Sequence, residues 1–287
     1  MDTLHVPVAA GVELTADLWP APEGSPHPVP FLLAHGLASN ARMWDGVAAR
    51  LNERGHTAVT VDLRGHGRSS KPVSPYAVSA VADDLAALVR GLGLERPVVA
   101  GQSWGGNVVI ELAARHPGLT RGLVCVDGGW LEPSAAFPSW EACRDALAPP
   151  RLAGRRLDEV EGYIRGAHAD WPETGIAGTL ANFERRPDGT IAPWLTFERH
   201  LLVLRGLWEH HPSRRYAEVR EPVLLVPAVP VGPDGRDTGR EAAVDGARTA
   251  LARARVRKVR GDHDIHAQHP VEVADVMLEA VLDGFVA

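Results

Sequence analysis

The stretch RPVVAGQSWGGNVVIELAAR, residues 96–115, decides the fold of this chain. Residues 96–100 read as a short buried strand, and residues 106–115 have the apolar spacing of an amphipathic helix. Between them lies Gly101-Gln102-Ser103-Trp104-Gly105, a G-x-S-x-G sequence. At a strand-to-helix junction this sequence is typical of a nucleophile elbow, a turn so sharp that the serine hydroxyl stands alone above the sheet edge. The glycines are needed because a Cβ would clash where the two backbones approach. The motif is frequent by chance, but its place between a strand and a helix makes it specific.

Strands and helices alternate on both sides of this motif. Apolar runs predict a hairpin at residues 6–10 and 12–18 and further strands at 29–34, 57–62, 121–127, 222–226 and 255–259. Helical spacing predicts helices at residues 41–54, 79–92, 240–253 and 271–285. This alternation implies an α/β fold with a parallel sheet and right-handed crossovers.

The alternation stops after Gly129 and resumes near Pro222. From Leu131 to about Arg220 we find no buried strand, but helical patches, many prolines and several tryptophans. We therefore predict a core domain made of residues 1–130 and 218–287 and a helical cap subdomain of residues 131–217. The aromatic residues of the cap have two interpretations: they hold together a small subdomain, or one or two of them line an apolar pocket.

Composition argues against several classes of partner. The net charge is −6 and the arginines are scattered, so neither nucleic acid nor an acidic membrane surface is an expected partner. Two cysteines do not make a disulfide framework. No apolar run approaches the roughly 18 residues of a membrane span, and the first residues do not resemble a signal peptide, so we expect a cytoplasmic protein. The glycine-rich residues 62–69 lack the Gly-Lys-Ser/Thr ending of a phosphate loop, and we expect no cofactor and no metal.

Ser103 needs a nearby base to remove its proton. The best candidate is His263, on the loop just after the last predicted strand. In a parallel sheet that loop lies at the same carboxyl edge as the elbow. His266 and His269 are rivals, but they approach the final helix and are expected to pack or cap there.

The base in turn needs a carboxylate that fixes its tautomer. Asp127 ends the strand that follows the elbow, whereas Asp234 and Asp237 follow the next strand. Both positions preserve the chain order serine, acid, histidine. We favour Asp127, because a rigid strand end positions a side chain better than a loop rich in Gly, Pro and Asp.

Acyl transfer also requires two donors aimed at the developing oxyanion. The backbone N–H of Trp104, at the start of the elbow helix, is one candidate. The backbone N–H of Leu37, in the loop after the strand 29–34, is the other. His35 in the same loop is expected to hydrogen-bond loop backbone rather than to act in catalysis.

Four landmarks in this order resemble the α/β-hydrolase superfamily over essentially the whole chain. They are His35-Gly36, the run DLRGHGRS at 62–69, GQSWGG at 101–106, and Gly261-Asp262-His263 followed by Pro270. The resemblance implies an eight-stranded, mostly parallel sheet flanked by helices, with a cap inserted after the sixth strand, and a Ser–His–acid triad. Many relatives carry an acid just after the strand matching 222–226, where this chain has residues 227–231, PAVPV. That departure favours Asp127 further.

These residues predict a serine hydrolase that cleaves an ester, lactone or thioester of a moderately hydrophobic small molecule through an acyl-enzyme on Ser103. Ser103 argues against haloalkane dehalogenases and epoxide hydrolases, which use Asp as nucleophile. The same triad could also serve carbon–carbon bond hydrolysis, proline iminopeptidase-like peptide cleavage or cyclisation of a biosynthetic intermediate. A non-catalytic small-molecule receptor is a further alternative. The sequence gives no indication of the oligomeric state.

Overall fold

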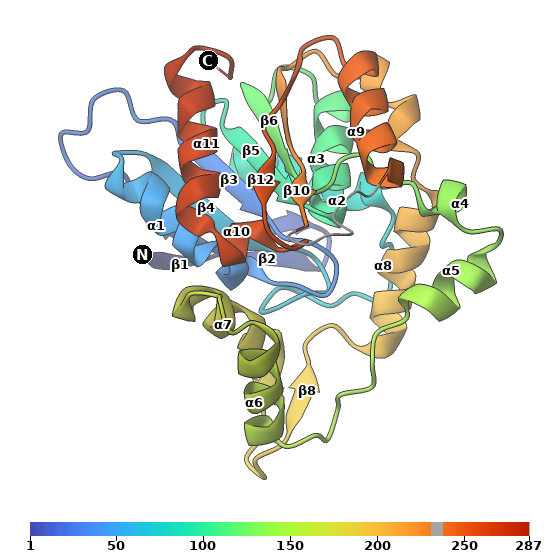
Figure 1. Cartoon of the computed structure of the whole chain (residues 1–287). Coiled ribbons are helices and arrows are strands. Elements are labelled where there is room, and N and C mark those ends of the chain that lie inside the picture. The colour runs from blue at the N-terminus through green and yellow to red at the C-terminus, as the bar shows by residue number, and fades with distance from the viewer. Residues whose placement is uncertain (231–237, 287) are drawn as a thin grey trace.

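The computed structural model describes residues 1–230 and 238–286, and its centre is one eight-stranded sheet (Figure 1). The strand order is β1-β2-β4-β3-β5-β6-β9-β11. The strands span Asp2–Ala9 (β1), Val12–Trp19 (β2), Pro30–Ala34 (β3), Thr57–Asp62 (β4), Val98–Gln102 (β5), Gly122–Val126 (β6), Val223–Val226 (β9) and Ala254–Val256 (β11). Strand β2 pairs antiparallel with β1 and β4, and all other pairs in the sheet are parallel. The predicted eight-stranded, mostly parallel sheet is confirmed.

Helices cover both faces of the sheet because the side chains of its buried strands alternate between the two faces. In β3, Phe31 and Leu33 join the apolar cluster under one face, and Leu32 and Ala34 join the cluster under the other. Helices α1 (Asp45–Glu53) and α11 (Pro270–Leu282) pack on the first face. Helices α2 (Val78–Gly91), α3 (Trp104–Arg115) and α9 (Thr238–Ala250) pack on the second.

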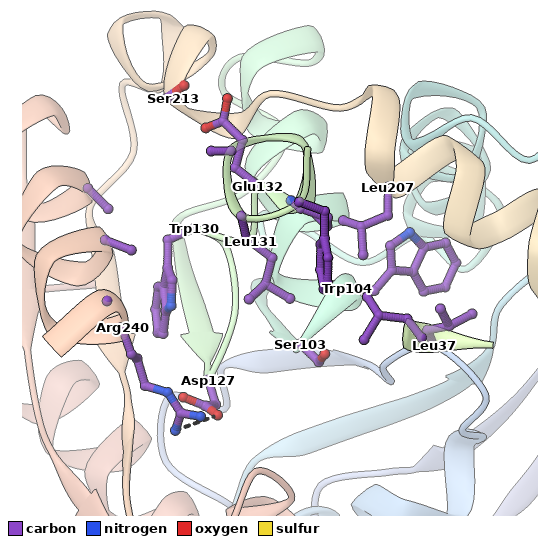
Figure 2. A pocket seen from close by; sticks show the side chains of 18 of the residues that line it. Leu37, Ser103, Trp104, Asp127, Trp130, Leu131, Glu132, Leu207, Ser213 and Arg240 are labelled. Carbon is purple, nitrogen blue, oxygen red and sulfur yellow. Dashed lines mark ion pairs between the residues drawn. The ribbon is translucent and has the colours of Figure 1, made fainter. Parts of the chain in front are cut away.

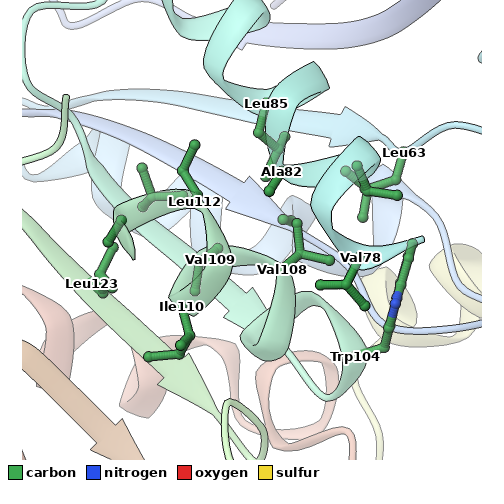
Figure 3. Packing of buried hydrophobic residues seen from close by; sticks show 14 of the residues in the cluster. Leu63, Val78, Ala82, Leu85, Trp104, Val108, Val109, Ile110, Leu112 and Leu123 are labelled. Atoms are coloured by element: carbon green, nitrogen blue, oxygen red, sulfur yellow. The ribbon is translucent and has the colours of Figure 1, made fainter. Parts of the chain in front are cut away.

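The packing of α2 on α3 fixes the helix that begins beside Ser103. Figure 3 shows Ala82 and Leu85 of α2 facing the α3 side chains Val108, Val109 and Leu112. All five side chains are fully buried. Helix α3 therefore packs closely against α2 and the sheet.

Several predicted elements differ from the observed ones at prolines or tight turns. The predicted helix 41–54 is a 3₁₀ helix, η1 (Ala41–Trp44), followed by α1. The predicted strand 255–259 is two pieces: β11 stays in the main sheet, whereas β12 (Val259–Arg260) pairs with β10 (Ala228–Val229). Strand β9 ends before Pro227, which has no N–H to extend the ladder. The final helix is preceded by a separate short helix, α10 (Ile265–Gln268), and begins at Pro270.

The segment between β6 and β9 lies outside the sheet and forms two lobes (Figure 1). The first lobe contains α4 (Pro133–Ala136), α5 (Trp140–Leu147) and α8 (Phe197–Glu209). The second lobe contains α6 (Leu157–Ala167), α7 (Glu173–Leu180) and the short antiparallel strands β7 (Phe183–Arg185) and β8 (Ile191–Pro193). The sequence predicts no buried strand in this segment, and in its two short strands Ile191 of β8 is the one described residue that is buried. A three-residue strand is too short for its alternation to be recognised in the sequence.

Each lobe has its own packing against the body of the protein. In the first lobe, Val203 and Leu207 of α8 join the cluster that contains the buried side chains of α2 and α3. Within this lobe the Trp140 and Trp208 rings pack edge to face with centroids 6.3 Å apart. In the second lobe, Ile176 and Leu180 join a cluster with Met43 of η1 and Ala267 of α10. The two lobes therefore approach the carboxyl edge of the sheet from different sides. None of the helices in the described ranges is both long and apolar enough to span a membrane.

Candidate active site

Ser103 lies in the sharp turn between β5 and α3. Its backbone has φ 53° and ψ −122°, a conformation that residues other than glycine rarely adopt. The glycines around it are required by close contacts: a Cβ on Gly101 would lie 2.2 Å from the Gly105 carbonyl oxygen, and one on Gly128 would lie 2.1 Å from the Ser103 carbonyl oxygen. The backbone N–H of Ser103 donates to the Val126 carbonyl over 2.9 Å. The strand-to-helix turn expected from the sequence is present.

His263 contacts both Ser103 and Asp127. Its Nε2 lies 2.8 Å from the Ser103 Oγ, and its Nδ1 lies 2.6 Å from the Asp127 Oδ2. The Gln102 amide, next to the serine, donates to the His263 carbonyl over 3.1 Å and ties the histidine loop to β5. Because an ionised carboxylate only accepts hydrogen bonds, Nδ1 carries the proton and Nε2 is free to accept from the serine hydroxyl.

Asp127 is held from three sides at the end of β6. Its side chain is only 2% exposed, and its backbone has φ 41°. Its Oδ1 accepts from the backbone N–H of Ala228 over 3.1 Å, and its Oδ2 lies 3.2 Å from Nη1 of Arg240 in α9 (Figure 2). These contacts fix the carboxylate so that one oxygen faces His263. Asp234 and Asp237, the alternative acids, lie outside the described residues.

The surroundings of His263 favour its protonated form. Burial lowers the pKa of His263, but the hydrogen bond with Asp127 and the nearby Asp264 carboxylate outweigh burial and raise this pKa above 6.5. Arg240 lowers the pKa of His263, because a nearby cation disfavours a second positive charge. The pKa of the base candidate therefore lies above the ordinary value of a histidine.

The loop after β3 packs directly against the start of α3. A Cβ on Gly36 would lie 3.1 Å from the Ser103 Cβ, and one on Gly105 would lie 2.4 Å from the His35 carbonyl oxygen. Leu37 and Trp104 line the same cavity as Ser103. Figure 2 shows all three on one side of that cavity. This is the neighbourhood that two oxyanion donors need, and their role stays a prediction.

The other histidines of the predicted site serve the scaffold. The His35 Nε2 accepts from the Leu63 N–H over 3.0 Å and its Nδ1 donates to the Gly36 carbonyl over 2.7 Å, while burial lowers its pKa to about 4. His266 is buried beside Trp44, with ring centroids 4.4 Å apart, and burial lowers its pKa to about 3. His269 stands at the N-cap position of α11.

The glycine-rich run 62–69 is a structural turn. Oδ1 of Asp62 accepts from the Ala41 N–H over 2.8 Å, and its Oδ2 accepts from Nε of Arg68 over the same distance. Arg64 forms a buried ion pair with Asp84 of α2. Within the described residues, no group of three or more His, Cys, Asp or Glu side chains is placed to hold a metal ion.

A cavity of about 960 Å³ opens beside Ser103, between the first lobe and the body of the protein. Its walls are mainly apolar, with Trp130, Leu131 and Leu207 among the residues that Figure 2 labels. Among the aromatic residues in and next to the inserted segment, Trp130 and Phe137 line this cavity, whereas Trp140 and Trp208 pack against each other. Sequence reasoning missed Arg240. Its position at the start of a helix that follows β9 could have placed it at the carboxyl edge.

The fold and the serine at its elbow define a class, the hydrolases of the α/β type. A sequence model described as alpha/beta hydrolase fold matches residues 29–156. The chain is 32% identical over 201 residues to a Mesorhizobium japonicum protein named 2-(acetamidomethylene)succinate hydrolase, covering 68% of this chain and 69% of that protein. It is 36% identical over 200 residues to a Caulobacter protein named putative carbamate hydrolase RutD, covering 68% and 70%. The chain therefore belongs to the α/β-hydrolase family and is a hydrolase.

Solved structures show the same fold over nearly the whole chain. The crystal structure of E-2-(acetamidomethylene)succinate hydrolase superposes with a TM-score of 0.79 at 23% identity and covers 98% of both chains. A thioesterase domain from the curacin biosynthetic pathway superposes with a TM-score of 0.73 at 19% identity, covering 97% of this chain and 99% of that chain. At these identities the likeness concerns the fold alone.

Proposed function

We propose that this protein is a serine hydrolase that forms an acyl-enzyme on Ser103, with His263 as base and Asp127 as its acid partner. The observation that carries the proposal is the continuous contact from Ser103 through His263 to Asp127, at 2.8 Å and 2.6 Å. A serine hydroxyl becomes a useful nucleophile when an adjacent base takes its proton and a third group orients that base.

The proposed reaction has two halves. In the first, the Ser103 Oγ attacks the carbonyl carbon while its proton passes to the His263 Nε2, and the backbone N–H groups of Leu37 and Trp104 stabilise the oxyanion. His263 then gives the proton to the departing atom, and the acyl group stays on the serine. In the second half, His263 takes a proton from water as the water oxygen attacks the acyl carbon. The bond from that carbon to the Ser103 Oγ then breaks, His263 returns the proton to this oxygen, and the acid is released.

The large cavity favours an uncharged, moderately hydrophobic substrate such as an ester, a lactone or a thioester. Its walls are mainly apolar. Two charged residues in them already have polar partners: Glu132 lies 2.7 Å from the His211 Nδ1, and Arg240 lies 3.2 Å from Asp127. A strongly charged acyl group would lose its hydration there without a new partner. We further propose that residues 131–217 act as the cap over this cavity.

A second candidate is the cleavage of an amide or carbamate of similar size. The names of two relatives favour it, because one contains an acetamido group and the other gives a carbamate as substrate. Including amides and carbamates in the assay panel separates this candidate from the first.

The experiment that tests the proposal is labelling with a fluorophosphonate probe, read by intact mass. We expect one adduct on the wild type and none on Ser103→Ala or His263→Ala, since the probe reacts only with an activated serine. An unlabelled wild type, or a His263→Ala variant labelled at the wild-type rate, contradicts the proposed site.

A further inference from the structure

Ser103 lies between two cavities of different size and chemistry. Besides the large cavity under the first lobe, a small cavity of about 140 Å³ lies on the side of the second lobe. Leu37, Ser103 and His263 line both. The two lobes of the inserted segment thus give the nucleophile two separate compartments rather than one pocket.

The small compartment is mainly polar, whereas the large cavity is mainly apolar. Its walls include polar side chains from the body of the protein and from the second lobe: Ser39, Gln102, His168, Thr179, Asn182 and Asp264. The Ser39 hydroxyl oxygen is buried and has no hydrogen-bond partner within the described part of the chain. An unpaired buried polar group is destabilising, so the site is suited to a ligand or water that supplies the missing hydrogen bond.

The small compartment also discriminates by charge. Asp264 contributes a carboxyl to it, and no lysine or arginine is found among the described residues of its walls. Burial raises the pKa of Asp264 and disfavours more negative charge there. An anionic group would meet no lysine or arginine among the described residues of this compartment, and His263 there is already paired with Asp127. A hydroxyl, a neutral amide or an ammonium group would find hydrogen-bond partners.

We propose that the small compartment binds the leaving group of the substrate, which is small, hydrogen-bonding and not anionic, while the large cavity binds a bulky apolar acyl group. This inference rests on the proposed acyl-enzyme function. A volume of 140 Å³ equals that of about four or five water molecules in the liquid, enough for a leaving group the size of ethylene glycol.

The assignment of the leaving group to the polar side follows from the second half of the reaction. The water that attacks the acyl-enzyme must take the place that the leaving group vacates. This is because the same His263 Nε2 gives a proton to the leaving group and later takes one from the water. Water needs two to four polar partners. The small compartment offers them close together in Ser39, Asp264 and His168, whereas the walls of the large cavity are mainly apolar.

Two isomeric esters test the orientation. In 2-hydroxyethyl 4-phenylbutanoate the small polar group leaves, and in 4-phenylbutyl glycolate the same two groups exchange places. After division by each ester's rate of alkaline hydrolysis, we expect kcat/KM to favour the first by about tenfold or more. Equal values or the reverse preference overturn the proposal. Ser103 labelling, measured in parallel, separates this failure from a failure of the proposed function, which would leave the wild type unlabelled.

A second pair tests the charge. Carbamoylmethyl and carboxymethyl 4-phenylbutanoate have leaving groups of nearly the same shape, one neutral and one anionic. We expect the anionic ester to react about tenfold more slowly or worse, and Asp264→Asn to reduce this penalty. Equal rates with the two esters, or an unchanged penalty in Asp264→Asn, overturn the role of Asp264.

Ser39→Ala gives an independent check with a smaller structural change. It should lower the preference for the 2-hydroxyethyl ester over the propyl ester of the same acid, because the two leaving groups differ only at the terminal hydroxyl. A preference that Ser39→Ala leaves intact contradicts the hydrogen bond assigned to this residue.

Discussion

Ser103, His263 and Asp127 form a chain of contacts in the candidate site, and two of these residues have a strained backbone conformation. Ser103 has φ 53° and Asp127 has φ 41°, and neither is a glycine. Such conformations cost on the order of 1–3 kcal/mol each and persist only where surrounding contacts impose them. At Ser103 this conformation is imposed by the close backbone packing around the neighbouring glycines, and at Asp127 it is imposed by the hydrogen bonds of the side chain. Positive φ angles also occur at His27, Ala38 and Arg96, but within the candidate site the strain falls on the two residues whose side chains meet His263.

Asp127→Asn tests the acid directly. The amide cannot hold the protonated Nδ1 of His263 as a carboxylate does, so the histidine loses its orientation for Ser103. We expect kcat to fall by about three to four orders of magnitude with the fold intact, by analogy with the same change in a serine protease triad. Asp234→Asn and Asp237→Asn serve as matched controls and should cost little. The assignment is refuted if Asp127→Asn stays active and either Asp234→Asn or Asp237→Asn loses activity.

The raised pKa of His263 predicts the pH profile. A protonated His263 cannot take the Ser103 proton, so kcat/KM should rise with pH, through an apparent pKa above 6.5. Arg240→Gln removes a nearby cation that opposes this protonation, and it should move the acid limb to still higher pH. The measurement is kcat/KM for one neutral ester from pH 5 to pH 9. An acid limb that moves to lower pH in Arg240→Gln contradicts this electrostatic account.

At the scale of elements, the sequence predicts what local patterns determine. Strand β4 (Thr57–Asp62) has the predicted bounds, since five of its six residues are buried and its apolar run is continuous. The β5–α3 turn was recognised because its glycines answer a local steric requirement. The division of the inserted segment into two lobes was not predicted, because it depends on contacts of α7 with η1 and α10, far away in the sequence.

The same distinction holds within the candidate site. Ser103 and Asp127 directly follow the neighbouring parallel strands β5 and β6, and His263 follows β12, which pairs with β10 just beyond the carboxyl end of β9. The strand order therefore brings the three residues to one edge of the sheet. Arg240 and Asp264 gain their significance from packing and charge around a cavity, which no residue spacing encodes.

Gly128→Ala tests the steric requirement at the elbow. The new Cβ would lie 2.1 Å from the Ser103 carbonyl oxygen, so backbone must move at the nucleophile itself. We expect the free energy of unfolding to fall by about 1–3 kcal/mol and fluorophosphonate labelling of Ser103 to slow strongly. Gly162→Ala in α6 is the control, because its Cβ meets nothing within 4 Å. That change should stabilise the helix by roughly 0.5–1 kcal/mol and leave labelling unaltered. Normal labelling in Gly128→Ala would refute this account of the elbow.

At the scale of the whole molecule, helix α3 joins the candidate nucleophile to both ends of the inserted segment. The Asn107 side chain accepts from the N–H groups of Gly129 and Leu131 over 3.1 and 3.2 Å and donates to the Leu131 carbonyl over 2.7 Å, where the segment begins. Its amide also lies 3.3 Å from Nδ1 of His210, where the segment returns. Glu111, one turn further along α3, lies 3.2 Å from the His210 Nε2. The first lobe, which walls the large cavity, is therefore fixed by the helix that begins beside Ser103.

Asn107→Ala tests this connection. It leaves buried backbone groups of Gly129 and Leu131 without partners, so we expect the free energy of unfolding in urea to fall by about 2–4 kcal/mol. Because the first lobe also loses its attachment, kcat/KM should fall more for a 4-phenylbutanoate ester than for the acetate of the same alcohol. Asn52→Ala is the matched control, since the Asn52 amide donates to the Pro20 carbonyl over 2.6 Å, outside the inserted segment. It should cost some stability and leave the ratio between the two esters unchanged. If Asn107→Ala destabilises the protein without altering that ratio, α3 supports the fold of the first lobe but does not set the shape of the large cavity.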